Sequence, residues 1–269
     1  MSLFEGPIWL VGCGNMAGAM LRRWLASGLD PAQVTVIRKS GAPVADGVTV
    51  LTALPPDGPA PALLMLGVKP QMLGDVAPRL APILAEETIL VSILAGVELA
   101  SLRAHFQTPR AIVRAMPNTP VALGAGVVGL VGEGLDDASR VRVDTLMAPL
   151  GLTEWLDERL FDVITALASS GPAFLFRFID ALAAAGAAAG LDRDAAERIA
   201  LATVAGAGQL AAQAGESPGR LADRVASPGG STRKGLDVLD AEGGLAPLLV
   251  ETIAAAVRRN QEMAAAARG

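Results

Sequence analysis

A short apolar run followed at once by closely spaced glycines constrains this chain more than any other feature. Ile8–Val11 is typical of a strand, residues 12–17 read Gly-Cys-Gly-Asn-Met-Ala, and a helical pattern continues to Ser27. Two glycines at this spacing permit a tight turn and close approach of the backbone to a pyrophosphate, and the helix N-terminus offers free N–H groups. We therefore predict a strand–turn–helix unit that binds a dinucleotide; the alternative is a glycine-rich turn without a ligand.

The first half of the chain repeats this alternation of apolar runs and helical patterns. Further strands are predicted at Val34–Ile37, Val48–Leu51, Leu63–Leu66, Ile89–Ile93, Ala111–Ala115 and Val127–Val131. Continuous Val, Ile and Leu without polar alternation is typical of strands covered on both faces, as in a mostly parallel sheet. The sequence predicts an α/β fold, with a Rossmann-like dinucleotide-binding domain over residues 1–156.

Strand patterns stop after about residue 157, and the chain becomes rich in Ala and Leu at helical spacing. Pro172 suits the first turn of a helix that runs to Gly190, Asp192 suits the N-cap of the next helix, and residues 244–268 predict the last one. We predict an all-helical domain over residues 157–269. Its many alanines permit close helix approach, so we expect it to pack against a second subunit.

Composition excludes several classes of function. The chain has 22 Lys plus Arg against 27 Asp plus Glu, which gives no electrostatic reason to expect nucleic acid or an anionic membrane as a partner. One Cys and one His leave no internal disulfide and no cluster for a metal site. The apolar stretch Val163–Leu191 is long enough to span a bilayer, but Arg177 and Asp180 interrupt it and favour a buried helix. No basic segment precedes the first apolar run, which favours a cytoplasmic protein.

The end of the second predicted strand indicates which dinucleotide binds. An acidic residue there would bind the ribose 2′-hydroxyl of NAD, but this chain has Arg38-Lys39-Ser40. Two cations and a hydroxyl suit a 2′-phosphate, so we expect NADPH, with NADH as the alternative. The competing interpretation is a solvated strand end.

The inventory of acids limits the chemistry. Carbonyl reduction commonly uses Tyr, His or Lys as the proton donor, but this chain has no Tyr, the single His105, and lysines only at positions 39, 69 and 234. On spacing alone His105 suits a surface or capping position. Such a poor supply of acids suits an imine substrate, whose nitrogen is basic enough to arrive protonated.

Three further sequence segments are candidates for ligand binding in a chain with a Rossmann-like fold. Lys69 follows the fourth predicted strand as a candidate phosphate or substrate cation, and otherwise a surface lysine. Asn118 lies between two prolines as a candidate contact for nicotinamide or ribose, and otherwise structural. Residues 226–232 read Ala-Ser-Pro-Gly-Gly-Ser-Thr before the helical stretch Arg233–Leu239. Small residues and hydroxyls at a helix N-terminus can hold a carboxylate, although an ordinary N-cap has the same pattern.

Together these sequence segments resemble the motifs of the Δ1-pyrroline-5-carboxylate reductase family, the enzymes that make proline. The matching segments are residues 12–17, 68–70, 92–96, 116–120, 165–173 and 227–232, and they cover nearly the whole chain in order. The resemblance implies reduction of the cyclic imine to L-proline by NADPH or NADH. It also implies a homodimer or larger assembly, in which the helical domains interlock and the active site forms at their interface.

The resemblance further implies roles for individual residues. The cofactor-binding residues would be Gly12, Cys13, Gly14, Asn15, Met16, Arg38, Lys39, Val68, Lys69, Pro70, Ala95 and Asn118. The substrate-binding residues would be Ser227, Gly229, Gly230, Ser231, Thr232 and Glu158. Thr232 would be the catalytic residue, with its hydroxyl at the ring nitrogen. No metal is expected.

The chain departs from the family pattern at a few positions. Phe174 stands where a tyrosine is usual and Ser169 where a glycine is usual, so one hydroxyl near the helix start is missing. Two alternatives remain. A β-hydroxyacid dehydrogenase-like enzyme would need a catalytic lysine early in the helical domain, where this chain has none, and an NADP(H) sensor without turnover would not need the intact residues 227–232.

Overall fold

The computed structural model of the chain describes residues 4–55 and 58–268. Their contacts form two compact units. The first comprises the described residues up to Ser170 together with those from Ala256 onward, and the second is Gly171–Ala255. The units therefore divide the chain later than the predicted boundary at residue 156. The reason is that Phe161 is buried in the core of the first unit, and that Asn260 of the last helix donates a hydrogen bond to the Asp162 carbonyl oxygen at 3.3 Å.

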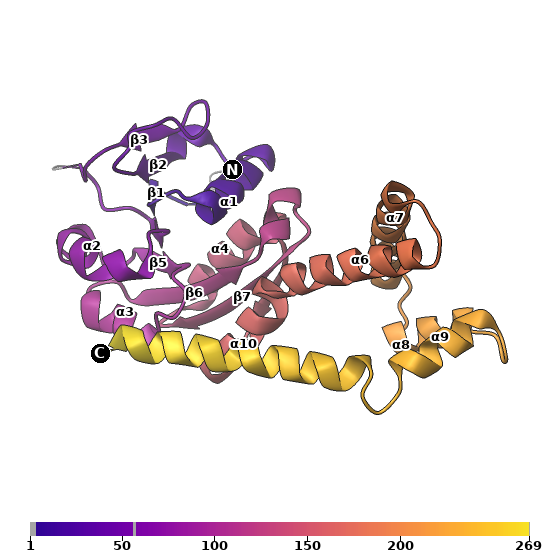
Figure 1. Cartoon of the computed structure of the whole chain (residues 1–269). Coiled ribbons are helices and arrows are strands. Elements are labelled where there is room, and N and C mark those ends of the chain that lie inside the picture. Colours follow the sequence, from indigo (N-terminus) through magenta and orange to yellow (C-terminus); the bar gives the residue numbers. More distant parts are fainter. Residues whose placement is uncertain (1–3, 56–57, 269) are drawn as a thin grey trace. The chain divides into compact units, whose positions relative to one another are not determined.

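The first unit is built on one sheet of eight strands, which confirms the predicted α/β class (Figure 1). The strands are β1 (Ile8–Val11), β2 (Val34–Ile37), β3 (Thr49–Leu51), β4 (Leu63–Leu66), β5 (Ile89–Ser92), β6 (Ala111–Pro117), β7 (Gly126–Glu133) and β8 (Gly151–Trp155). Their order across the sheet is β3-β2-β1-β4-β5-β6-β7-β8, and every neighbouring pair except β6 and β7 is parallel.

Helices cover both faces of this sheet because its central strands are apolar on both sides. The helices of the first unit are α1 (Asn15–Ala26), α2 (Leu73–Leu80), α3 (Leu99–His105), α4 (Asp137–Met147), α5 (Phe161–Ile164) and the end of α10 (Leu245–Arg268). Helices α1 and α4 share one buried apolar cluster with alternate strand residues such as Leu10. Helices α2 and α3 share the other cluster, with Trp9 and Val11.

Two features of the sheet differ from a simple parallel pattern. Residues 118–125 are too few for a crossover between β6 and β7, so β7 returns antiparallel to β6. The sequence analysis missed β8, which forms the sheet edge beside β7 and alternates half-buried with exposed residues. Edge strands lack the continuous apolar run that indicates a central strand.

The second unit is helical. Its helices are α6 (Gly171–Ala188), α7 (Arg193–Gln213), α8 (Pro218–Val225), α9 (Ser231–Leu239) and the first part of α10. Asp192 caps α7 as predicted, because its carboxylate accepts a hydrogen bond from the Ala195 amide at 3.1 Å. Helices α6 and α7 pack against each other as neighbours in the chain.

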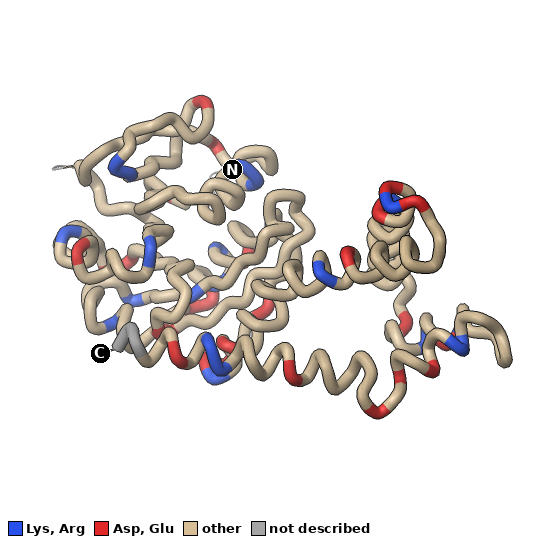
Figure 2. Tube along the Cα trace, in the orientation of Figure 1, with Lys and Arg blue, Asp and Glu red and all other residues tan. Residues whose placement is uncertain are grey.

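Helix α6 is apolar but open to solvent within the single chain. Figure 2 shows few charged residues along it, and the segment Glu158–Ala188 is long and apolar enough to cross a membrane by length and composition. Only Ala183 of α6 is buried, while Leu175, Phe176 and Phe178 are exposed. The prediction of a buried helix is therefore wrong for the single chain.

Candidate functional site

The glycine-rich turn after β1 has the geometry that the sequence predicts. Gly12 has a φ of +83°, and a Cβ atom there would lie 2.7 Å from the carbonyl oxygen of Gly67 and 2.8 Å from Cγ1 of Val68. Only glycine fits a position that combines positive φ with such close approach of the backbone. The turn is therefore packed against the end of β4 and holds the start of α1 in place.

The N-terminus of α1 is open. Its N-cap is Gly14, which has no side chain to accept a hydrogen bond from the first turn, and a Cβ atom built at Gly14 would meet nothing within 4 Å. The first N–H groups of a helix lack partners within the helix and carry the positive end of its dipole. Asn15 and Met16 begin this helix, so their amides can hold a pyrophosphate.

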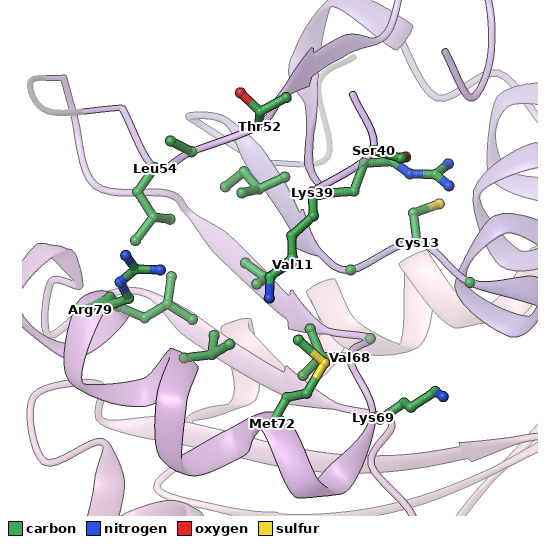
Figure 3. Close-up of a pocket in the computed structure, with 18 residues that line it drawn as sticks. Val11, Cys13, Lys39, Ser40, Thr52, Leu54, Val68, Lys69, Met72 and Arg79 are labelled. Atoms are coloured by element: carbon green, nitrogen blue, oxygen red, sulfur yellow. The ribbon is translucent and has the colours of Figure 1, made fainter. Parts of the chain in front are cut away.

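A cavity of about 430 Å³ lies at the carboxyl ends of β1, β2 and β4 (Figure 3). Its lining includes seven predicted cofactor residues, which are Gly12, Cys13, Gly14, Arg38, Lys39, Val68 and Lys69. Parallel sheets bind ligands at these strand ends. The structure thus brings most of the predicted cofactor residues to one place.

The charge of this cavity is positive. Arg38, Lys39, Lys69 and Arg79 line it, and no Asp or Glu does. Within residues 4–55 and 58–268, none of these four cations forms an ion pair. The sequence analysis missed Arg79, whose position at the end of α2 gave no motif to find it by. Unpaired cations around a phosphate-binding turn suit a dinucleotide with several negative charges.

Cys13 lies in the turn and lines this cavity. Burial raises the pKa of the Cys13 thiol, and the nearby Arg38 and Arg22 guanidinium groups oppose that effect. The thiolate is therefore disfavoured at neutral pH, and the side chain acts as a small apolar group.

Pro70 and Ala95 line a different cavity of the first unit. It measures about 730 Å³ and is bounded by the start of α2, the loop between β5 and α3, and the end of α10. His105 also lines it, so this residue borders a hollow rather than a flat surface. The 430 Å³ cavity and this one have no lining residue in common.

Asn118 has a structural role in the chain. Its side chain is buried, its Nδ2 donates to the Ala168 carbonyl oxygen at 2.9 Å, and its Oδ1 accepts from the Val127 amide at 2.8 Å. The amide thus joins the end of β6 to β7 and to the π-helical turn Thr165–Ser169. It lines neither cavity described above.

Glu158 likewise has partners within the first unit. Its Oε1 accepts hydrogen bonds from Nη1 of Arg114 at 2.6 Å and from the Leu99 amide at 2.8 Å. The Arg114 side chain is only 5% exposed, and its guanidinium lies 3.9 Å from the centre of the Phe161 ring. Glu158 therefore neutralises a buried cation and holds the start of α3.

Residues 227–232 form a turn that leads into α9 of the second unit. Gly229 has a φ of +72°, and the Gly230 amide donates to the Ser227 carbonyl oxygen at 3.0 Å. Gly230 is the N-cap of α9 and provides no side-chain hydrogen bond, while Ser231 and Thr232 are exposed in its first turn. Backbone N–H groups and two hydroxyls are therefore available together to an anion.

Comparison with known proteins gives the family. Residues 7–96 match the protein family described as "NADP oxidoreductase coenzyme F420-dependent". Residues 158–263 match the family described as "Pyrroline-5-carboxylate reductase dimerisation". Pyrroline-5-carboxylate reductases of Glycine max and Pseudomonas aeruginosa are each 36% identical, over 98% and 96% of this chain and 100% and 96% of their own length.

Solved structures agree. A pyrroline-5-carboxylate reductase from Coxiella burnetii is 31% identical and has a TM-score of 0.89, over 96% of this chain and 98% of that chain. The Plasmodium falciparum pyrroline carboxylate reductase, solved with NADP bound, has the same fold at 21% identity and a TM-score of 0.80, over 97% of this chain and 98% of that one. With full-length relatives above 30% identity, this chain belongs to the pyrroline-5-carboxylate reductase family.

Proposed function

We propose that this protein reduces Δ1-pyrroline-5-carboxylate to L-proline with NADPH as the preferred hydride donor, and with NADH as the alternative. The observation that carries the proposal is a phosphate-binding turn beside unpaired cations, in a chain that also keeps an open helix N-terminus with two hydroxyls at residues 231 and 232. The family assignment and the NADP bound to the Plasmodium falciparum relative support the same reaction.

The cofactor fits the first unit. The amides that follow Gly14 would hold the pyrophosphate, and Arg38 with Lys39 would face the adenosine phosphate. When bound, NADPH supplies a hydride to the imine carbon. Val68 and Lys69 would border the ribose, with Pro70 and Ala95 towards the nicotinamide, and the sheet fixes these residues because each follows a central strand.

The substrate would be held by residues 227–232. The carboxylate would accept hydrogen bonds from the amides at the start of α9, with Ser227, Gly229, Gly230 and Ser231 shaping the turn. Thr232 would place its hydroxyl at the ring nitrogen and keep the proton of the imine there. Glu158 contributes by fixing the start of α3, directly after the loop that contains Ala95.

The reaction is tested by loss of NADPH absorbance with purified protein and Δ1-pyrroline-5-carboxylate. NADH and a reaction without substrate are run in parallel. We expect turnover that favours NADPH, because Arg38 and Lys39 face a 2′-phosphate that NADH lacks. Turnover that favours NADH would keep the reaction and discard that role for the two cations. Cofactor binding without any turnover would instead indicate a sensor.

The proposal includes a homodimer, which larger assemblies can contain. Residues 171–255 expose large apolar side chains, namely Leu175, Phe176, Phe178, Leu182, Leu191, Ile199, Leu201, Leu210, Val225, Val238, Leu239, Leu248, Leu249 and Val250. So many exposed apolar side chains are typical of a chain that buries them between subunits, and the match to a dimerisation family supports this. We expect light scattering at micromolar concentration to give at least twice the 27.3 kDa of one chain, and a monomeric mass would contradict this.

A cytoplasmic location belongs to the same proposal, supported by the single cysteine, since cytosolic proteins rarely carry disulfides. The expectation that neither nucleic acid nor a membrane is a partner stays a prediction.

A further inference from the structure

A third cavity, which we call the α1 cavity, adjoins the glycine-rich turn. It measures about 430 Å³ and is lined by Cys13, Gly14, Asn15, Gly18, Leu21, Arg22, Arg38, Pro43 and Val44. It shares Cys13, Gly14 and Arg38 with the first cavity, so the two hollows meet at the turn. The cavity that Lys39 and Lys69 line extends from the turn towards β4 and α2, whereas the α1 cavity lies along α1.

Arg22 is placed to act at this turn. Its Nη1 lies 3.3 Å from the position that a Cβ atom on Gly18 would occupy, and Sγ of Cys13 lies 3.7 Å from the same point. The side chain therefore folds back over the preceding helical turn towards the N-terminus of α1, the direction that side chains in helices favour. Arg22 and Arg38 line the same cavity as Cys13, and both guanidinium groups lower the pKa of its thiol against the opposing effect of burial.

Neither guanidinium is neutralised by the protein. In the described part of the chain, Arg22 and Arg38 form no ion pair, and no acidic residue lines the cavity. Two like charges beside the positive end of a helix repel each other and the helix dipole. Arg103, by contrast, is paired with Glu133 at 2.6 Å. An arrangement of this kind becomes favourable when an anion binds between the two groups.

The position of the cavity indicates which anion. The pyrophosphate is expected on the amides that follow Gly14, so the cavity that Arg22 and Arg38 both line remains for another phosphate. In a Rossmann fold, the end of the second strand faces the ribose 2′ position, and Arg38 follows β2 directly. A phosphate monoester carries up to two negative charges and accepts paired hydrogen bonds from a guanidinium.

We propose that Arg22 is a further specificity-determining residue, which binds the 2′-phosphate of NADPH together with Arg38 and so selects NADPH over NADH. This inference rests on the proposed function for the identity of the dinucleotide. The cations after β2 were predicted from the sequence, but a contribution of Arg22 from α1 was not.

The test is Arg22→Gln, with calorimetric binding of NADPH, NADH, adenosine 2′,5′-bisphosphate and ADP. We expect the Kd to rise at least about 10-fold for the two ligands with a 2′-phosphate and to change less than about 2-fold for NADH and ADP. Arg22→Lys keeps the charge but not the planar pair of donors, so we expect it to recover part of the affinity. Arg22 is exposed, so these variants should fold normally.

Arg23→Gln is the matched control. It removes the same charge from the same helix. Arg23, however, donates from Nε to the Pro149 carbonyl oxygen at 2.9 Å, and it lines neither of the two cavities that meet at the glycine-rich turn. We expect its ratio of NADPH to NADH affinity to match the unmodified protein. Equal weakening of both dinucleotides by Arg22→Gln, or no change, would overturn the inference. Cofactor binding can be measured without turnover. If the protein does not reduce the imine but Arg22→Gln selectively loses affinity for NADPH, the proposed function is refuted and the role of Arg22 is supported.

Discussion

Thr232→Ala is expected to lower kcat for Δ1-pyrroline-5-carboxylate about 100- to 1,000-fold. The hydroxyl of Thr232 would lie at the ring nitrogen, where the charge changes during reduction, and removal of one group placed for such a change commonly costs a factor of this size. Thr232 is exposed in the first turn of α9, and the residue before that helix provides no side-chain cap. Alanine is well tolerated in helices, so the variant should keep its fold.

Steady-state kinetics with NADPH measures this loss, and NADPH binding to the same protein gives the control. The Kd for NADPH should stay within about 2-fold, because Thr232 is proposed to contact the substrate and lines neither cavity at the glycine-rich turn. Thr232→Ser keeps the hydroxyl and should retain most of the activity. Unchanged kcat in Thr232→Ala would contradict the catalytic role of this residue.

Glu158→Ala is expected to lower the free energy of unfolding by about 2 to 4 kcal/mol. The substitution leaves the guanidinium of Arg114, which is 5% exposed, without its carboxylate, and removes the acceptor for the Leu99 amide. Breaking a buried ion pair on one side is costly because the other charge remains buried, and the 37% exposure of Glu158 reduces the loss.

Urea unfolding followed by circular dichroism tests this prediction. Glu197→Ala is the matched control, because Glu197 pairs with Arg193 on the surface of α7 and should change stability by less than about 1 kcal/mol. Glu158→Gln keeps an acceptor for the Leu99 amide and should be less destabilising than alanine. An unchanged unfolding free energy in Glu158→Ala would refute the structural role. A raised KM for the imine in the folded glutamine variant would support the substrate contact implied by the resemblance.

Local patterns were enough to predict much of the first unit. The strands β1, β2 and β4 occupy the predicted residues, because central strands of a parallel sheet are apolar on both faces and stand out as continuous runs. The turn at Gly12 and the cap at Asp192 were predictable for a similar reason. Each depends on a few neighbouring residues whose backbone preferences are strong.

Features that depend on distant neighbours were not predictable from such patterns. The edge strand β8 has no continuous apolar run, and the antiparallel course of β7 follows from the short connection after β6. No motif joins Arg114 to Glu158, since 44 positions separate them and they meet only in the folded chain, where Arg114 also lies over the Phe161 ring.

The cofactor site shows the same division. The glycine-rich turn and the cations after β2 were predictable from the sequence, because each is a run of consecutive residues with a known backbone geometry. The fold brings Arg22 of α1 to one cavity with Arg38, and Arg79 of α2 to the other, and no local pattern links these residues. Electrostatic fields add up through space rather than along the chain, so the fold decides which charges act on one ligand.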